Sequence, residues 1–288
     1  MQVTRRLVPF FIALFSLLVY LTPAHAEGEG GWDKQFQTQI HSWMDTIATR
    51  DAQFKLWQNA KTDVQTLGAG QHQWLVSISQ NGKQVGYLVV GELPSPKGAE
   101  KFVLLEYGVG EYILFDDAFA PREIAAEPVY DGFASHWLLT QNPAAQMVNA
   151  KTGESYPTDF TANEAVMNSL SVDELAAEGQ SLTQARVLRS EEASPFDQIS
   201  WVYNLYSASD VSLGQLWQQQ SEAGPVTLTV PMYHSRVLAP FVVGSLHLWN
   251  DQNAYVGVWD EGLRFVPYSY AHKVGTFHVK TAQAMPVQ

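Results

Sequence analysis

The stretch from Gln71 to Asp117 constrains the fold of this chain more than any other part of the sequence. It contains apolar runs rich in β-branched and aromatic residues, which favour strands, separated by turn-forming residues. The dipeptide Asn81-Gly82 joins the first two runs. Both residues tolerate the positive φ that the two-residue turn of a β-hairpin requires. The stretch therefore predicts consecutive antiparallel strands, at residues 74–78, 85–92, 102–107 and 112–115.

Before this stretch, apolar residues recur at helical spacing between Trp32 and Thr66. A break at Thr49–Asp51 divides the pattern, so we expect two helices, with Asp51 as the N-cap of the second. The apolar stripe of the first helix should pack on the sheet, and its members are Phe36, Ile40, Trp43 and Ile47. Residues 32–158 are thus predicted to form a domain of helices on an antiparallel sheet.

Residues 159–194 are polar and acidic, and we predict a linker with short helices there. Residues 195–281 are predicted to form a β-rich domain with a helix at 212–221, capped by Ser212. The expected fold class is α+β, with N-terminal helices packed on an antiparallel sheet, followed by a β-rich α+β C-terminal domain. The strands expected in the C-terminal domain are residues 226–230, 241–248, 254–259, 263–267 and 274–280.

The first 26 residues have the features of a secretory signal peptide. Arg5 and Arg6 precede an apolar run at 7–21, and Ala24-His25-Ala26 is a small-x-small cleavage motif. An uncleaved N-terminal anchor is the alternative, because the apolar run approaches the length of a membrane span. The cleavage motif and the polar residues after it favour cleavage. We therefore expect a secreted, extracellular protein cleaved near Ala26, with no membrane insertion afterwards.

The mature chain is strongly acidic. The formal net charge of the whole chain is −12, and it becomes −14 without the leader, which contains two arginines and no acidic residue. A surface of this sign repels phosphate backbones, so nucleic acid is excluded as a partner. The charge is typical of a soluble exported protein, and it also suits cations or basic partners.

The sequence contains no cysteine. Cysteine nucleophiles, thiolate metal sites, iron–sulfur clusters and disulfides are therefore excluded. The serine-hydrolase motif Gly-x-Ser-x-Gly is absent too, because Gly244-Ser245-Leu246 lacks the second glycine of this nucleophile elbow. We predict no catalytic residue, no metal site and no cofactor. We interpret the irregularly spaced histidines of the C-terminal half as structural, with their rings hydrogen-bonded to the backbone, and these are His234, His247, His272 and His278.

Aromatic and acidic residues are crowded into the last hairpins. Exposed aromatic rings there would stack on sugars, although strand alternation alone sends about half of such a set into the core. We predict that a binding surface includes the following contact residues: Trp249, Asp251, Trp259, Asp260 and Tyr268.

Three stretches carry a resemblance to a known family. Residues 86–111 contain Gly-Tyr-x-x-Val followed by Leu-Glu-Tyr-x-x-Gly, residues 136–157 contain Asn-Ala-Lys-Thr-Gly-Glu, and residues 240–262 form a strand–turn–strand pattern. These stretches resemble secreted Gram-positive proteins related to C39-like, papain-like cysteine peptidases and their accessory N-terminal domains.

The resemblance implies a papain-like C-terminal region without activity. The nucleophilic cysteine of the family is absent, and Ala239-Pro240-Phe241 occupies the place of its histidine. Asp260 lies where the family would have an orienting acidic residue, and it belongs equally well to an Asp-Glu-Gly turn.

We therefore expect a secreted, non-catalytic binding or accessory protein with a peptidase-like fold, whose partner is a cell-wall component or a glycan. The alternative is a propeptide-like inhibitor or chaperone of a secreted peptidase, acting through an edge strand or a helix. A cysteine-independent hydrolase, using serine or paired carboxylates, is the third hypothesis.

Overall fold

The computed structural model describes residues 29–68, 70–94, 100–120, 126–139, 146–197, 202, 206–207, 211–219 and 224–280. The predicted signal peptide, residues 1–26, lies outside these ranges. No helix within them is both long and apolar enough to cross a membrane.

The helices of the described chain are α1 (Glu29–Arg50), α2 (Leu213–Gln218) and α3 (Tyr268–Val274), with short 3₁₀ helices η1 (Ala52–Trp57), η2 (Gly132–Ala134), η3 (Met167–Ser169) and η4 (Val172–Glu174). The first strands are β1 (Lys61–Leu67), β2 (Gln73–Gln80), β3 (Lys83–Pro94), β4 (Glu100–Val109), β5 (Ala126–Val129), β6 (His136–Leu139), β7 (Gln146–Asn149) and β8 (Ala176–Ala177). The later strands are β9 (Leu182–Val187), β10 (Tyr206–Ser207), β11 (Thr227–Met232), β12 (Val237–Trp249), β13 (Asn253–Trp259), β14 (Leu263–Pro267) and β15 (Thr276–Lys280).

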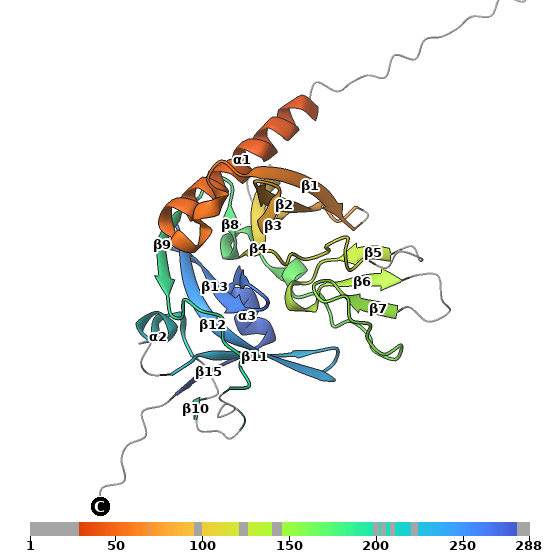
Figure 1. Cartoon of the computed structure of the whole chain (residues 1–288), viewed down its shortest axis with the longest axis vertical. Helices are drawn as coiled ribbons and strands as arrows, with labels where there is room; N and C mark the ends of the chain where they lie inside the picture. Colours follow the sequence, from red (N-terminus) through yellow and green to blue (C-terminus); the bar gives the residue numbers. More distant parts are fainter. Residues whose placement is uncertain are drawn as a thin grey trace, which may run out of the picture.

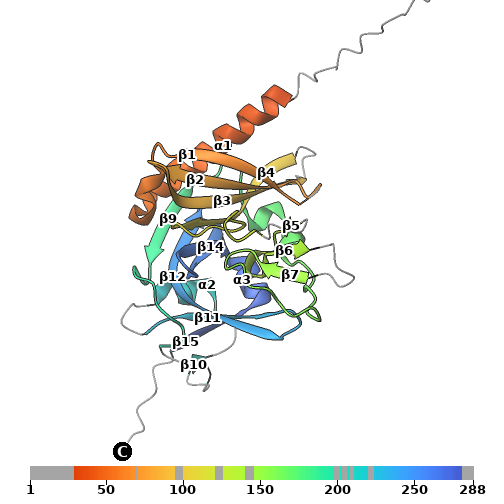
Figure 2. The same ribbon diagram turned by 45° about the vertical axis from the view of Figure 1, so that its right-hand side comes forward.

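The architecture is dominated by one antiparallel sheet of 12 strands, with few helices. Its main path runs β1-β2-β3-β4-β14-β13-β12-β11-β15-β10, while β8 pairs with β4 and β9 with β12. A separate three-stranded sheet contains β5, β6 and β7. The large sheet curves, so that β1–β4 lie at one end and β11 and β15 at the other, with α3 and the small sheet between them (Figure 1, Figure 2).

Strands from the two predicted domains are direct neighbours in this sheet. β14 pairs antiparallel with β4, with Leu263 opposite Val109 and Phe265 opposite Tyr107. The predicted linker, residues 159–194, contains the short helices η3 and η4, and it also supplies β8 and β9 to the sheet. The division into domains at 32–158 and 195–281 stays a prediction, and the sheet is continuous across it.

The hairpin predicted at Asn81-Gly82 is confirmed. β2 and β3 pair antiparallel around the turn, with Gln80 opposite Lys83. Asn81 and Gly82 have φ values of 53° and 78°, the left-handed conformation that this turn requires.

The helix predicted after Asp51 is wrong in extent. Asp51 does cap it, accepting a hydrogen bond from the Gln53 N–H at 2.9 Å, but the helix is the short η1 and ends at Trp57. The chain then forms the strand β1, in which Lys61 and Asp63 are exposed and the residue after each is partly buried. Threonine and valine in Lys61–Leu67 favour a strand, and pairing with β2 outweighs the weak helical periodicity.

The strand predicted at 112–115 is also wrong. Residues 112–113 have no regular secondary structure and 114–115 form a turn, and the Phe115 N–H donates to the Ala150 carbonyl at 2.8 Å instead of to a strand neighbour. Phe115 has a φ of 56°, which a regular strand does not allow. In the C-terminal half, α2 begins at its predicted cap Ser212, whereas α3 was not predicted.

Each face of the large sheet has its own apolar core. The predicted stripe on α1 is confirmed: Phe36, Ile40, Trp43 and Ile47 are at most 2% exposed, and they belong to a cluster with η1 and one face of the sheet. Side chains of α2, α3 and the small sheet pack with the opposite face.

The left-handed turn at Gly82 gives a prediction about stability. A Cβ added at Gly82 would meet no atom within 4 Å, so Gly82→Ala tests the backbone conformation alone. We expect a loss of about 1 kcal/mol in the free energy of unfolding, measured by urea denaturation. Gly31→Ala is the control, because Gly31 lies in α1 and an added Cβ there also has open space. Its stability should be unchanged or higher, and equal losses in both variants would contradict the explanation.

Candidate functional site

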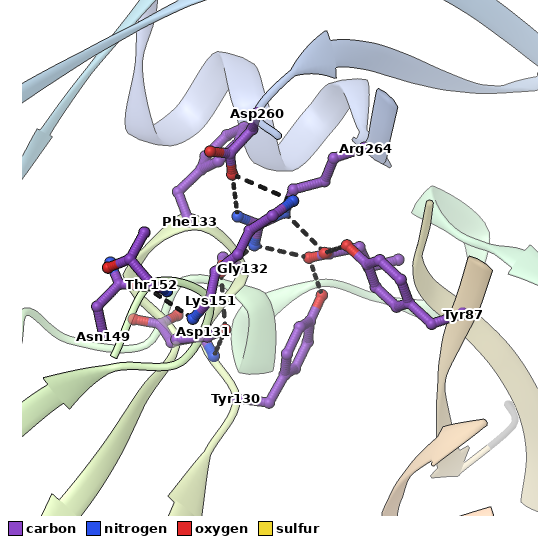
Figure 3. Close-up of polar contacts among 12 residues, drawn as sticks. Tyr87, Tyr130, Asp131, Gly132, Phe133, Asn149, Lys151, Thr152, Asp260 and Arg264 are labelled. Atoms are coloured by element: carbon purple, nitrogen blue, oxygen red, sulfur yellow. Dashed lines mark hydrogen bonds and ion pairs between the residues drawn. The ribbon is translucent and has the colours of Figure 1, made fainter. Parts of the chain in front are cut away.

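A buried charge cluster lies where β14 meets β4 (Figure 3). Arg264 on β14 is 3% exposed and binds both oxygens of Glu106 on β4, with Nε–Oε1 at 2.7 Å and Nη2–Oε2 at 3.1 Å. Its Nη1 donates to Asp260 at 3.0 Å, and its Nη2 donates also to the Gly132 carbonyl. The guanidinium therefore connects the centre of the large sheet with the loop between β5 and β6.

Tyrosine hydroxyls complete the contacts of Glu106. Tyr87 on β3 and Tyr130 after β5 each donate to one of its carboxylate oxygens. Burial, followed by the charge of Glu106, raises the pKa of both tyrosines well above the usual range, so both stay protonated donors. Glu106 thus accepts four hydrogen bonds, which is what a buried carboxylate needs.

The charges of the cluster balance. Lys151, which follows β7, lies 3.9 Å from Asp260 and is 4% exposed. Burial lowers the pKa of Lys151, although Asp260 opposes this. Burial would raise the pKa of Asp260, but Lys151 and Arg264 hold it below its usual value. The cluster pairs two cations with two anions, so it ties distant elements of the chain together.

A second buried network contains a histidine and an aspartate. His247 on β12 is fully buried, with Nε2 3.0 Å from Asp51 Oδ2 and Nδ1 2.8 Å from the Tyr107 hydroxyl. Trp249 donates to the same hydroxyl at 3.3 Å. A proton on Nε2 satisfies every contact, because Nε2 then donates to Asp51 and Nδ1 accepts from Tyr107. Burial lowers the pKa of His247, which favours this neutral form.

This Asp51–His247 pair resembles the base of a hydrolase, but its surroundings do not allow that role. Ser245, two residues earlier on β12, is also fully buried, and its hydroxyl donates to the Arg186 carbonyl at 2.9 Å. A general base must reach a proton of the substrate or of a nucleophile, and Tyr107 occupies the second nitrogen of His247. His247 therefore has a structural role, but its partners are the side chains of Asp51 and Tyr107 and not the backbone groups that we predicted.

The structure does not bring the five predicted contact residues together on one surface. Trp249 is fully buried, and Trp259 and Tyr268 are partly buried, with the Tyr268 hydroxyl donating to the Val211 carbonyl at 3.0 Å. Asp260 belongs to the charge cluster. Asp251 alone among the five is exposed. Alternate residues of a strand point to opposite faces of the sheet, but both faces are covered at these hairpins. Alternation therefore did not expose half of the five predicted residues.

A shallow, wide-open groove lies between the solvent face of α1 and the start of β9, with about 870 Å³ of open space along it. Residues three and four apart on α1 form one wall, because they lie on the same helix face. Thr46 links the two walls: its hydroxyl accepts from the Leu182 N–H at 3.1 Å. Nine of the ten lining residues have a polar or charged side chain, and the ten are Thr38, His41, Ser42, Asp45, Thr46, Thr49, Arg50, Ser181, Leu182 and Thr183.

Asp251 lies at the edge of this groove. Its backbone N–H donates to the Thr183 hydroxyl at 3.1 Å, and its carboxylate accepts from the Gln184 side chain at 2.9 Å. Hydrogen bonds from the side chains of Gln184 and Thr183 to the carboxylate lower the pKa of Asp251, so it is ionised at neutral pH. The sequence indicated the polar face of α1 only indirectly, through the apolar stripe on the opposite side. The pairing of β9 with β12, which builds the second wall, has no local signal.

Asp131 is a further candidate that the sequence did not single out. It is 6% exposed, and its Oδ1 has no hydrogen-bond partner among the described residues. Burial raises its pKa to about 7, partly offset by a hydrogen bond from the Met167 backbone. Asp131-Gly132 reads in the sequence as an ordinary exposed turn, so no pattern there indicates a buried carboxyl group.

The described ranges contain no group of three or more histidine, aspartate or glutamate side chains placed to hold a metal ion. A scan against models of known protein families finds no match to this chain, and a search of curated proteins finds none either. Similarity therefore assigns no function, and the geometry has to carry the proposal.

The charge cluster predicts strong coupling between Arg264 and Glu106. Glu106→Gln and Arg264→Met should each lower the free energy of unfolding by about 3–5 kcal/mol, because each leaves a buried charge without its partner. The double variant should lose clearly less than the sum of the two single losses. Urea denaturation of the four proteins measures this.

The control for this cycle is the exposed pair Arg236–Asp159. Arg236→Met and Asp159→Asn should each cost less than about 1 kcal/mol and show little coupling. Simple additivity at Arg264 and Glu106 would contradict the central role of their ion pair.

The raised pKa of Asp131 predicts that the free energy of unfolding falls as the pH rises. Between its unfolded pKa near 3.8 and its folded pKa of about 7, the folded protein keeps a proton that the unfolded chain has released. The free energy of unfolding should therefore fall by up to about 4 kcal/mol as the pH rises towards 7, because the unfolded chain releases the proton more readily than the folded protein. Asp131→Asn mimics the neutral form, so it should be more stable than wild type at pH 8 and similar to it at pH 4.

Urea denaturation at the two pH values measures this difference. Asp117→Asn, at an exposed position, is the control and should change the free energy of unfolding by less than about 0.5 kcal/mol at either pH. A destabilised Asp131→Asn variant at pH 8 would mean that the carboxylate is needed for folding.

Proposed function

We propose that this chain is a secreted, non-catalytic binding protein that holds a polar ligand, such as a cell-wall glycan, in the groove between α1 and β9. The observation that carries the proposal is the lining of that groove, where hydroxyl groups and charged side chains line an open volume of about 870 Å³. Drug-sized ligands bind in mostly apolar pockets, so this lining suits a molecule that is itself covered with hydroxyl or amide groups.

Several side chains in the groove are free to change their hydrogen-bond partners. His41, Ser42, Asp45 and Thr49 are exposed on consecutive turns of α1. Together they present donors and acceptors along a helix face of about 12 Å, at 1.5 Å per residue. The acidic mature chain disfavours an anionic ligand. A neutral or amino-substituted glycan fits both features.

The buried networks support the non-catalytic part of the proposal. The Asp51–His247 and Glu106–Arg264 pairs use their hydrogen-bonding capacity on internal partners. The C39-like resemblance fits the same reading, since Asp260, its suggested orienting residue, is held by Arg264. We further propose that the fold is α+β, with α1 and η1 as the N-terminal helical layer of a peptidase-like accessory protein.

The alternative role, as a propeptide-like inhibitor or chaperone of a secreted peptidase, would use an exposed strand edge. β1 is the end strand of the main path. It carries the exposed charged residues Lys61 and Asp63, and such charges discourage the addition of another strand. The groove is therefore the better supported binding surface.

The proposal predicts that the purified mature protein sediments with isolated cell-wall glycan and that this depends on the groove. His41→Ala with Asp45→Ala should weaken binding about tenfold, since each lost hydrogen bond is worth about 0.5–1.5 kcal/mol. Ser42→Trp should also weaken it, because the indole ring would cover part of the groove surface. Dissociation constants from co-sedimentation and a glycan array measure the effect.

Lys34→Ala is the matched control, because Lys34 is exposed on α1 and does not line the groove. It should bind like the wild type. If all of these variants bind glycan as the wild type does, the binding site lies outside the groove. If the protein binds no glycan, the proposal is overturned.

A further inference from the structure

A small cavity lies on the opposite side of the large sheet from α1, next to α3. It is formed by the loop between β5 and β6, the residues just before η3, the end of β11, and α3. Asp131 lines it, together with Phe133 and Tyr270. The groove residues on α1 are not part of it, so the cavity is independent of the proposed glycan site.

The backbone around Asp131 is held firmly. The Tyr270 hydroxyl donates to the Asp131 carbonyl at 3.1 Å and accepts from the Phe133 N–H at 3.0 Å. Gly132 has a φ of 52°, and a Cβ there would lie 2.4 Å from the Tyr270 ring. The Gly132 carbonyl is also bound by Arg264. The backbone that carries Asp131 is thus fixed, and the side chain is buried.

The carboxyl group is nevertheless left without a balancing charge. None of the ion pairs in the described chain includes Asp131, and its Oδ1 accepts no hydrogen bond. The titratable groups that face it are Glu164, exposed at the rim, and the hydroxyls of Tyr233 and Tyr270. No one of these three groups carries positive charge. The site thus has negative potential and an unused acceptor.

The walls and size of the cavity narrow the choice of ligand. Phe133, Val230, Met232 and Val274 provide apolar surface around the carboxyl group. The cavity volume is about 30 Å³, and a volume of about 10–15 Å³ already holds one water. The cavity therefore has room for an ammonium head group, whereas a guanidinium group or a sugar is too large. The stem of an alkylammonium ligand then extends along the apolar walls towards the open side of the cavity.

We propose that this cavity binds a primary alkylammonium group, which either the lysine side chain of a basic protein partner or a free alkylamine supplies. The ammonium nitrogen donates to Asp131 Oδ1, and the methylene stem packs between the apolar walls. Lysine side chains commonly bury their stems in this way. The acidic chain also steers cations towards its surface.

The test uses the purified mature protein, n-butylammonium chloride and a lysine-containing peptide, acetyl-Gly-Lys-Gly-amide. The same peptide with norleucine in place of lysine lacks the charge and is the matched ligand control. Heteronuclear NMR titration at pH 8 should show saturable shifts around Asp131, with a dissociation constant of about 1 mM, the affinity of a small ligand with one charge-assisted contact. Burial raises the pKa of Asp131 to about 7, so binding should weaken at least fivefold at pH 5.5, where the group is protonated.

Asp131→Asn should weaken binding of butylammonium at least tenfold while the protein stays folded. Asp251→Asn, at an exposed position outside the cavity, should bind as the wild type does.

Binding of both butylammonium and the lysine peptide would identify a lysine side chain as a ligand, and binding of butylammonium alone would identify a free amine. Absence of saturable shifts at pH 8, equal binding by Asp131→Asn, or equal binding of the norleucine peptide would overturn the proposal and leave the cavity as a water site. None of these outcomes depends on His41 or Asp45, so failure here is distinct from failure of the glycan proposal.

Discussion

The ion pair between Arg264 and Glu106 is the interaction on which the remaining structure depends. A buried charge is costly unless a partner and hydrogen bonds offset the loss of water. Here the offset needs contributions from β3, β4 and β14, from the loop between β5 and β6, and from Lys151 after β7. These elements can reach Glu106 and Arg264 only when the large sheet and the small sheet are both in place. The cluster therefore specifies one arrangement of segments that apolar packing alone would not distinguish.

The two proposed binding sites lie on opposite faces of the same sheet, and both consist of polar groups that the core does not use. On one face, α1 buries its apolar stripe and leaves a polar side exposed beside β9. On the other face, Tyr270 and Arg264 fix the backbone around Asp131, and one oxygen of its carboxyl group, Oδ1, has no hydrogen-bond partner among the described residues. In both cases the backbone that carries the side chains is held in place, by helix α1 or by these hydrogen bonds, which lowers the entropic cost of binding a ligand.

Local features of the fold were predictable, and features that depend on distant pairing were not. The turn at Asn81-Gly82 and the apolar stripe of α1 follow from a few adjacent residues. The error after Trp57 arose because pairing of β1 with β2 decided the conformation of residues 61–67. Trp249 looked like a contact residue because the sequence does not show that β12 is covered on both faces. Glu106 and Arg264 lie 158 residues apart, and nothing near either one indicates the other. The groove and the Asp131 cavity likewise combine segments from distant parts of the chain.

The pairing of β4 with β14 also bears on how the protein folds. β4 cannot complete its hydrogen bonds on that side, and Glu106 cannot meet its countercharge, until residues 263–267 are available. Contacts between residues so far apart in sequence form slowly, because a long loop must close first. The hairpins of β1 to β4 need only neighbouring residues, whereas the edge of β4 and the Glu106 carboxylate stay unpaired until residues 263–267 have been synthesised. The last strands of the chain therefore decide when the centre of the large sheet becomes complete.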